Sequence, residues 1–165
     1  TLFSKIEKEY NSTLALAKKA TTKPTVLSGA MYQKIWYVPQ GESWVSLFLK
    51  DSRSNYLWSN TKCTGSLVIP FEVILEKAKD ADFWIAPGDY SSLKQMSDSN
   101  PHYSQFDSFK NKKVYSYAVN KGAKSGIIYF EWSPTRPDWV LKDLIKIFHP
   151  ELLPHHKLFF FTKLE

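Results

Sequence analysis

The chain has 165 residues, which is enough for one domain with a substantial hydrophobic core. Its formal net charge is +6, but the basic residues are scattered and no nucleic-acid-binding motif is present, so we expect a solvated basic surface and no nucleic-acid partner. Cys63 is the single cysteine, which excludes an intrachain disulfide framework. The sequence contains no run of about 18 apolar residues, so no membrane-spanning helix is predicted.

The first part of the chain predicts a helix and then a short strand. Apolar residues recur at helical spacing through Leu2–Ala20, which is typical of an amphipathic helix. A strand is expected at Thr25–Leu27, after Pro24, and Ser28 and Gly29 end it. Because ligands of α/β proteins usually bind beside the carboxyl ends of strands, the loop that follows is a candidate site.

An aromatic segment comes next at Met31–Gly41 and contains Trp36 and Tyr37. We expect an irregular loop here, because Pro39 and Gly41 interrupt it. Short helices then alternate with short strands. The expected helices span 43–51, 70–81 and 91–97, the expected strands span 55–58, 82–86 and 113–119, and loops are expected at 59–66 and 120–126.

The clearest helix pattern lies at Thr135–Leu153. Pro137 is tolerated in a first turn, apolar residues recur at helical spacing, and Pro150 is expected to end the helix. Lys142 and Asp143 are expected to point away from the apolar face.

The chain is predicted to close on an apolar strand at Leu158–Thr162. Strands and helices thus alternate after the first helix. This order favours an α/β fold, a three-layer sandwich with a mostly parallel sheet and helices on both faces, preceded by a long helix.

No catalytic motif is present. The chain lacks a Gly-x-Ser-x-Gly elbow, a Gly-x-Gly-x-x-Gly turn and a phosphate-binding loop. His149, His155 and His156 lie close in sequence, but this is weak evidence for a metal site, and a polar contact at a helix C-terminus accounts for His149. We therefore expect neither a catalytic residue nor a metal ligand.

Aromatic residues gather near the predicted strand ends. Trp36 and Tyr37 follow one strand, Tyr90 follows another, and Tyr129 precedes the last helix. If the sheet is parallel, these loops meet at one edge, and a concave aromatic surface there would suit a large, flat, hydrophobic ligand. The alternative, that each ring simply packs in the core, stays open.

Two glutamates, Glu42 and Glu131, are expected near the same edge. A carboxylate at a helix start is stabilised by the helix dipole. An exposed carboxylate can also bind an arginine of a partner protein. The residues alone leave both roles open.

Several short segments, in their order and spacing, resemble the C-terminal lobe of bacterial ABC-importer substrate-binding proteins for iron complexes, haem and cobalamin. The resemblance covers nearly the whole chain, with one departure at Arg53–Ser54, where family members often carry two glycines. The segments are Pro24–Gly29, Trp36–Pro39, Gly41–Ser43, Asn55–Trp58, Phe71–Glu72, Ala81–Ile85, Arg136–Asp138 and His149–Leu152.

The resemblance implies two α/β lobes joined by a long helix, with a ligand held between them. Residues 1–22 would be the end of the connecting helix and residues 23–165 the C-terminal lobe, so a second lobe is expected outside these residues. The implied ligand contacts, given by loop position, are Trp36, Tyr37, Tyr90 and Glu131.

The resemblance also implies partners and a location. Glu42 would dock on arginines of a membrane permease. No intrinsic cofactor is expected, and the transported ligand would be an iron complex, haem or a corrinoid. The protein would lie in the periplasm or on the outer face of the cytoplasmic membrane, as an exported lipoprotein.

The leading hypothesis is therefore a binding protein without enzymatic activity that captures a ferric siderophore or haem. Cobalamin is the alternative ligand. A different class is an α/β enzyme that uses Asp89 or Glu131 as a base, although it would lack a nucleophile or cofactor motif. A third hypothesis is an interaction domain that holds a protein partner through the aromatic edge.

Overall fold

The computed structural model describes residues 1–165 and has a main sheet of five strands in the order β4-β1-β6-β7-β8. The strands are β1 (Thr25–Ser28), β4 (Asn55–Tyr56), β6 (Phe83–Ile85), β7 (Val114–Ser116) and β8 (Thr162–Lys163). Four of them are parallel, and β8 pairs antiparallel with β7. The predicted mostly parallel sheet is confirmed.

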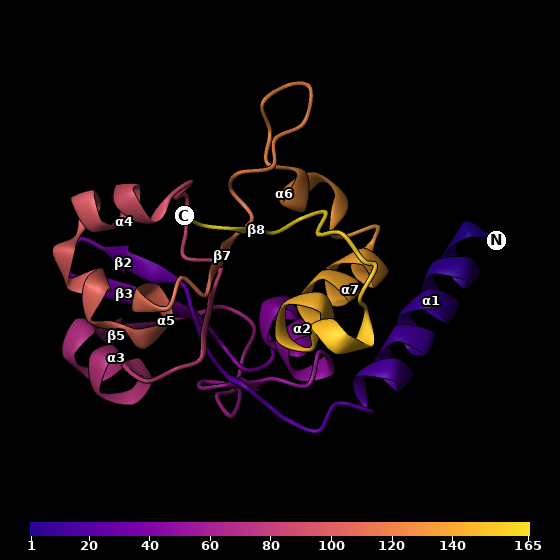
Figure 1. Ribbon diagram of the computed structural model, residues 1–165, viewed down its shortest axis with the longest axis horizontal. Coiled ribbons are helices and arrows are strands. Elements are labelled where there is room, and N and C mark those ends of the chain that lie inside the picture. Colours follow the sequence, from indigo (N-terminus) through magenta and orange to yellow (C-terminus); the bar gives the residue numbers. More distant parts are fainter.

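Helices cover both sides of the main sheet (Figure 1). α2 and α7 lie on one side, whereas α3, α4 and α5 lie on the other. The helices are α1 (Leu2–Ala17), α2 (Trp44–Asp51), α3 (Phe71–Ala78), α4 (Leu93–Ser99), α5 (Asp107–Lys110), α6 (Ile128–Trp132) and α7 (Pro137–Phe148), with 3-10 helices at Pro101–Gln105 and Pro150–Leu152. This arrangement confirms the α/β fold class. No helix is both long and apolar enough to cross a membrane.

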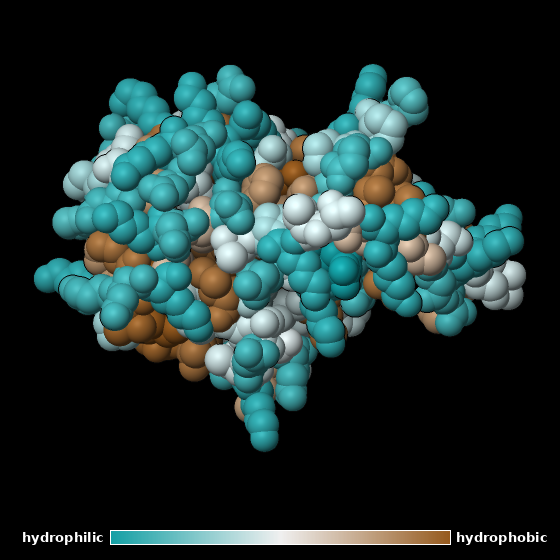
Figure 2. All heavy atoms as spheres, turned by 60° about the horizontal axis from the view of Figure 1, so that its bottom comes forward, coloured by the Kyte–Doolittle hydropathy of each residue, from teal (hydrophilic) through white to brown (hydrophobic).

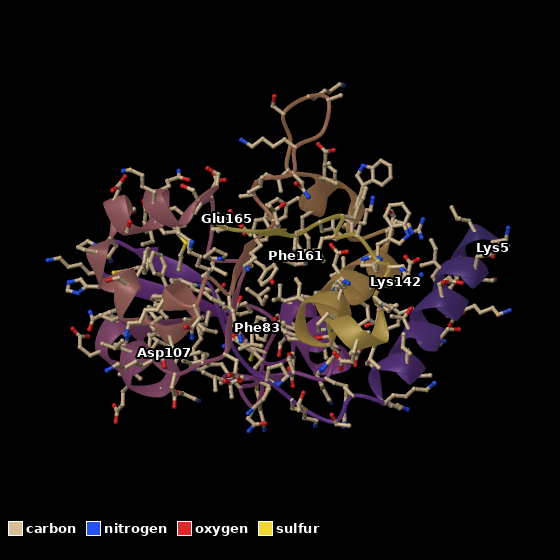
Figure 3. All side chains as sticks on the ribbon, in the orientation of Figure 1. Lys5, Phe83, Asp107, Lys142, Phe161 and Glu165 are labelled. Carbon is tan, nitrogen blue, oxygen red and sulfur yellow. The ribbon has the colours of Figure 1, made fainter.

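The first helix is held on the outside of α7. Ala17 is fully buried and packs with Leu141 and Ile145 of α7. Further along the same contact, Nζ of Lys142 lies 2.9 Å from Oε2 of Glu9, and Figure 3 shows Lys142 on the side of α7 that faces α1. The apolar stripe predicted for α1 therefore packs on the lobe near its C-terminal end.

The expectation of an irregular loop at Met31–Gly41 is wrong. The segment forms an antiparallel hairpin of β2 (Ala30–Tyr32) and β3 (Ile35–Pro39), and β3 also pairs with β5 (Ser66–Pro70). The hairpin turns on two residues with positive φ, at 50° for Gln33 and 72° for Lys34. Such turns usually carry glycine or asparagine, so this sequence gives no sign of the turn.

This second sheet, β2-β3-β5, encloses an aromatic core against the main sheet. Trp36 of β3 is fully buried, with its ring centroid 5.3 Å from that of Trp84 in β6. Tyr103 and Phe106 complete the cluster, at 5.2 and 5.4 Å from Trp84. The core therefore ties the hairpin rigidly to the central strands.

The helix expected at Thr135–Leu153 is interrupted. α7 ends at Phe148, and a separate 3-10 turn follows from Pro150, because proline lacks the N–H that the next helical hydrogen bond requires. The expectation that Asp143 points to solvent is wrong, since it is fully buried.

The buried Asp143 carboxylate also explains why the last strand starts later than predicted. It accepts hydrogen bonds from the backbone N–H groups of Phe159, Phe160 and Phe161, at 2.7–3.2 Å. These donors are thus unavailable for strand pairing, and β8 begins only at Thr162.

Candidate functional site

A cleft opens at the carboxyl ends of β1 and β6 and beyond β7. It has a volume of about 570 Å³ and is bounded on one side by the outer face of the second sheet and on the other by α6. Its lining residues are mostly aromatic or small: Ser28, Gly29, Ala30, Met31, Tyr32, Tyr37, Pro39, Val45, Ser66, Ala86, Gly88, Asp89, Tyr90, Tyr117, Tyr129 and Phe130. This is the edge at which ligands of α/β proteins usually bind.

The floor of the cleft depends on a glycine. Gly29 has a φ of 82°, and a Cβ atom there would collide with the backbone carbonyl of Tyr37. Its N–H donates a 3.2 Å hydrogen bond to the carbonyl of Ala86 at the end of β6. The two strand ends can approach the hairpin this closely only because residue 29 carries no side chain.

A polar group without a protein partner lies in the same floor. Ser28 is only 1% exposed, and its Oγ atom has no hydrogen-bond partner. Buried hydroxyls in proteins are normally paired. Ser28 lines the cleft, but its Oγ atom has almost no accessible surface, so the unpaired hydroxyl lies just beneath the floor.

Aromatic rings form the opposite wall. Tyr117 and Tyr129 stack with their ring planes 18° apart and centroids 5.1 Å apart. Phe130 packs edge-on against Tyr117, also at 5.1 Å, and remains 61% exposed. A flat molecule in the cleft would therefore meet ring faces and edges rather than flexible aliphatic chains.

Of the four predicted ligand residues, the structure brings Tyr37 and Tyr90 into the cleft. Tyr37 is 41% exposed on the outer face of β3. Tyr90 follows β6, and its hydroxyl shares a 2.9 Å hydrogen bond with Oγ of Ser99.

The other two predicted residues lie elsewhere. Trp36 is behind the cleft floor, with no exposed surface, and its Nε1–H donates a 3.0 Å hydrogen bond to the carbonyl of Ser28. Glu131 of α6 is exposed, but its carboxylate lies against Gly122 and Gly126, at the base of the loop that projects between β7 and α6 in Figure 1. It therefore supports that loop and does not line the cleft.

Alternation along β3 separates neighbouring aromatic residues. In a strand, successive side chains point to opposite faces, so Trp36 points inward and Tyr37 outward. A loop has no such alternation, so the expectation of a loop could not separate the inward Trp36 from the outward Tyr37. Two further cleft residues, Tyr32 and Tyr117, were not singled out for the same reason, because each lies in or just after a strand whose facing was unknown.

The cleft has an unusual charge balance for this chain. Asp89 is its only carboxylate, and no lysine, arginine or histidine lines it, although the chain carries 22 lysines and arginines. Burial is the main cause of a raised pKa at Tyr117, and the negative charge of the nearby Asp89 raises that pKa further. Burial is also the main cause at Tyr129, and together with the electrostatic effect of Tyr117 it raises the pKa of Tyr129 to about 12. These two phenols, which are neutral at neutral pH in any case, therefore keep their protons to a higher pH than exposed tyrosines do.

Glu42 lies outside the cleft, one residue before Ser43, which caps α2. Its side chain is exposed, and Oε2 accepts a 2.9 Å hydrogen bond from the N–H of Cys63. One carboxylate oxygen is thus held by the backbone while the other is free to accept a further donor.

The histidines are used inside the fold. The His149 ring is buried and hydrogen-bonds the carbonyl of Arg53 at 3.0 Å, and the His156 ring contacts Asp143 at 2.7 Å. No cluster of three or more His, Cys, Asp or Glu side chains with the spacing of a metal site is found.

Comparison with known proteins gave two curated relatives and no matching family model. An uncharacterized lipoprotein of Methanocaldococcus jannaschii is 30% identical over 160 residues, covering 95% of this chain and 37% of that protein. An uncharacterized protein of the same organism is 23% identical over 155 residues, covering 92% of this chain and 44% of that protein. The chain therefore spans less than half of the length of either relative.

Solved structures show the same fold. A TroA-like periplasmic binding protein of Veillonella parvula matches with a TM-score of 0.65 and 15% identity, covering 98% of this chain and 56% of that one. A periplasmic haem-binding protein of Roseiflexus matches with a TM-score of 0.62 and 13% identity, covering 92% of this chain and 55% of that one. A periplasmic vitamin B12-binding protein of Vibrio cholerae matches with a TM-score of 0.57 and 8% identity, covering 86% of this chain and 49% of that one. The resemblance seen in the sequence is confirmed at the level of the fold: the chain folds like about half of a periplasmic solute-binding protein.

Proposed function

We propose that this chain is one lobe of the substrate-binding protein of an ABC importer, and that its aromatic cleft holds an iron complex or haem. The observation that carries the proposal is the position of the cleft. It lies at the carboxyl edge of the main sheet and is built from Tyr37, Tyr90, Tyr117 and Tyr129, in a chain with the fold of solute-binding proteins. Similar structures are described as binding haem or vitamin B12, so a corrinoid is the alternative ligand within this class.

The geometry of the cleft suits binding of a ligand that is not chemically changed. The cleft is open to solvent on this lobe, so a second lobe would have to close over the ligand to bury it. Aromatic faces supply apolar contact area, and the few polar groups fix orientation. The solved neighbours are binding proteins, and Glu131 does not line the cleft, which leaves Asp89 as the one carboxylate that the enzyme hypothesis could use there.

Delivery would use a separate surface. Glu42 stands at the start of α2, outside the cleft, with one oxygen free for a charge-assisted hydrogen bond to a permease arginine. A location outside the cytoplasmic membrane is supported by the periplasmic neighbours, and lipid attachment by the relative described as a lipoprotein.

Ligand binding can be tested by tryptophan fluorescence. The two-lobe protein that contains this lobe is titrated with a ferric siderophore, haemin and cobalamin, and we expect saturable quenching by one of them. Tyr37→Ala should weaken that binding about tenfold, which corresponds to about 1.4 kcal/mol. Phe3→Ala is the control, since Phe3 is an exposed aromatic residue on α1 far from the cleft lining. Lack of saturable quenching by all three would contradict the proposal.

Docking can be tested in cells that contain the complete importer. Glu42→Lys should abolish uptake and leave ligand affinity unchanged, because Glu42 lies outside the cleft. Glu72→Lys on α3 is the control for adding a positive charge to an exposed helix start. Normal uptake by the Glu42→Lys variant would rule out this docking role.

A further inference from the structure

The cleft differs in charge from the rest of the molecule. The chain has a formal net charge of +6, yet none of its basic side chains lines the cleft. Lys121 and Lys124 are exposed on the projecting loop and Lys34 is exposed at the tip of the β2–β3 hairpin, but none of the three belongs to the lining. A bound anion would therefore find no cation inside the cleft to replace its water.

The single charged group of the lining is available to a ligand. Asp89 is exposed, follows β6 and takes part in no ion pair within the protein. A carboxylate in this position attracts a cation and repels an anion, and the effect grows when a second surface excludes water. The charge of the ligand should therefore decide how well it binds.

The remaining polar groups of the cleft are neutral. The Ser28 hydroxyl is buried without a partner beneath the floor, and the phenols of Tyr117 and Tyr129 are neutral at neutral pH, as phenols ordinarily are, with burial raising each pKa further. The sulfur of Met31 is already contacted by the side-chain amide of Asn100, at 3.1 Å. The phenols can donate hydrogen bonds to ligand oxygens, but they cannot balance a negative charge.

We propose that the cleft selects metal chelates with a neutral or cationic face, and that Asp89 sets this preference by direct contact with the ligand. The inference rests on the proposed function and narrows it, because it favours neutral and cationic chelates over anionic ones such as tricatecholate complexes and haem with its carboxylates. Tyr37 and Tyr117 supply the uncharged contacts that all members of the selected class share.

A matched ligand series tests the preference. The ferric complex of desferrioxamine B is a monocation through its free ammonium group, its N-acetyl derivative is neutral, and its N-succinyl derivative is a monoanion. The metal coordination is the same in all three. We expect the affinity of the two-lobe protein to fall in that order, by roughly tenfold for each unit of charge at low ionic strength. Quenching of tryptophan fluorescence provides the measurement.

Two variants assign the effect to Asp89. Asp89→Asn should bring the three affinities to within about threefold of one another, since it removes the charge and keeps the size of the side chain. Glu76→Gln on the outer side of α3 removes a carboxylate outside the cleft and should leave the order unchanged. Lys124→Gln should also leave it unchanged, whereas a larger loss for the anion would show that the loop lysines form the binding surface and would overturn the inference.

The outcomes separate the inference from the function on which it rests. Equal affinities, or tightest binding of the anion, would overturn the charge preference and leave the proposed binding function in place. Failure of all three chelates, of haemin and of cobalamin to bind would overturn the proposed function and the preference with it.

Discussion

The backbone N–H of Phe160 donates a 2.7 Å hydrogen bond to Oδ2 of Asp143, a residue in the middle of helix α7. Phe159 and Phe161 donate to the same carboxylate, and the His156 ring contacts its other oxygen at 2.7 Å. One buried side chain thus fixes the segment between α7 and the last strand. Because that segment continues into β8, Asp143 also sets the edge of the main sheet.

Replacing this carboxylate should be costly. Asp143→Asn keeps the size of the side chain but presents an amide N–H₂ to groups that are themselves donors. Since hydrogen bonds to a charged group each contribute about 1.5–3 kcal/mol, we expect the free energy of unfolding to fall by about 3 kcal/mol. Urea denaturation measures the change, and Asp80→Asn at an exposed position serves as the control. A change below about 1 kcal/mol would show that the Asp143 contacts matter little.

Gly29 should tolerate no side chain. Gly29→Ala places a Cβ atom against the carbonyl of Tyr37 at a φ of 82°, so both the backbone and the hairpin must shift. We expect a loss of about 3 kcal/mol or more in the free energy of unfolding, measured by thermal and urea denaturation. The matched change Gly65→Ala meets only the end of the flexible Gln40 side chain and should alter stability by about 0.5 kcal/mol or less. Equal effects of the two changes would contradict this account.

Truncation of Trp36 should mainly lower stability, whereas truncation of Tyr37 should mainly weaken ligand binding. Trp36 is fully enclosed by other aromatic rings, so Trp36→Ala should lower the free energy of unfolding by about 3–5 kcal/mol. Tyr37 is 41% exposed, and Tyr37→Ala should cost about 1 kcal/mol or less while weakening ligand binding. Calorimetric unfolding and ligand titration of both variants measure the two effects. Equal loss of stability would place Tyr37 in the core.

The regular elements could be predicted because their patterns are local. The helical spacing of apolar residues in α1 and α7 and the short buried runs of β1 and β6 suffice to predict an α/β lobe with a mostly parallel sheet. The hairpin could not be predicted, because Gln33 and Lys34 turn it without the usual glycine or asparagine. Hydrogen bonds between distant segments, as from Asp143 to Phe160, leave no periodic trace in the sequence at all.

The candidate site was predictable to the same extent as the strands. Tyr90 lines the cleft, as its place in the loop after β6 predicts, because the carboxyl end of that strand can be recognised from the sequence. Trp36 and Tyr37 could not be told apart without knowing that they lie in a strand, where neighbours face opposite ways. The charge balance of the cleft depends on which side chains gather from several separate segments, so it became visible only in the folded chain.

Buried tyrosines should make the protein sensitive to alkali. Burial is the main cause of a raised pKa at six positions: Tyr10, Tyr56, Tyr103, Tyr115, Tyr117 and Tyr129. A phenol whose pKa is raised in the folded state binds its proton more tightly there than in the unfolded chain. The resulting stability is fully present below pH 10.0, the ordinary pKa, and is lost as the pH rises through the folded-state value.

Tyr129 allows this effect to be isolated. Its pKa rises from 10.0 to about 12, and such a difference corresponds to about 3 kcal/mol of stability lost between those pH values. Tyr129→Phe removes the ionisable group and keeps the ring, so its stability should fall less over the same pH interval. Urea denaturation at a series of alkaline pH values, with tyrosinate absorbance recorded in parallel, measures the difference. If both proteins lose stability equally between pH 10 and 12, then the hydroxyl of Tyr129 does not resist ionisation in the folded state.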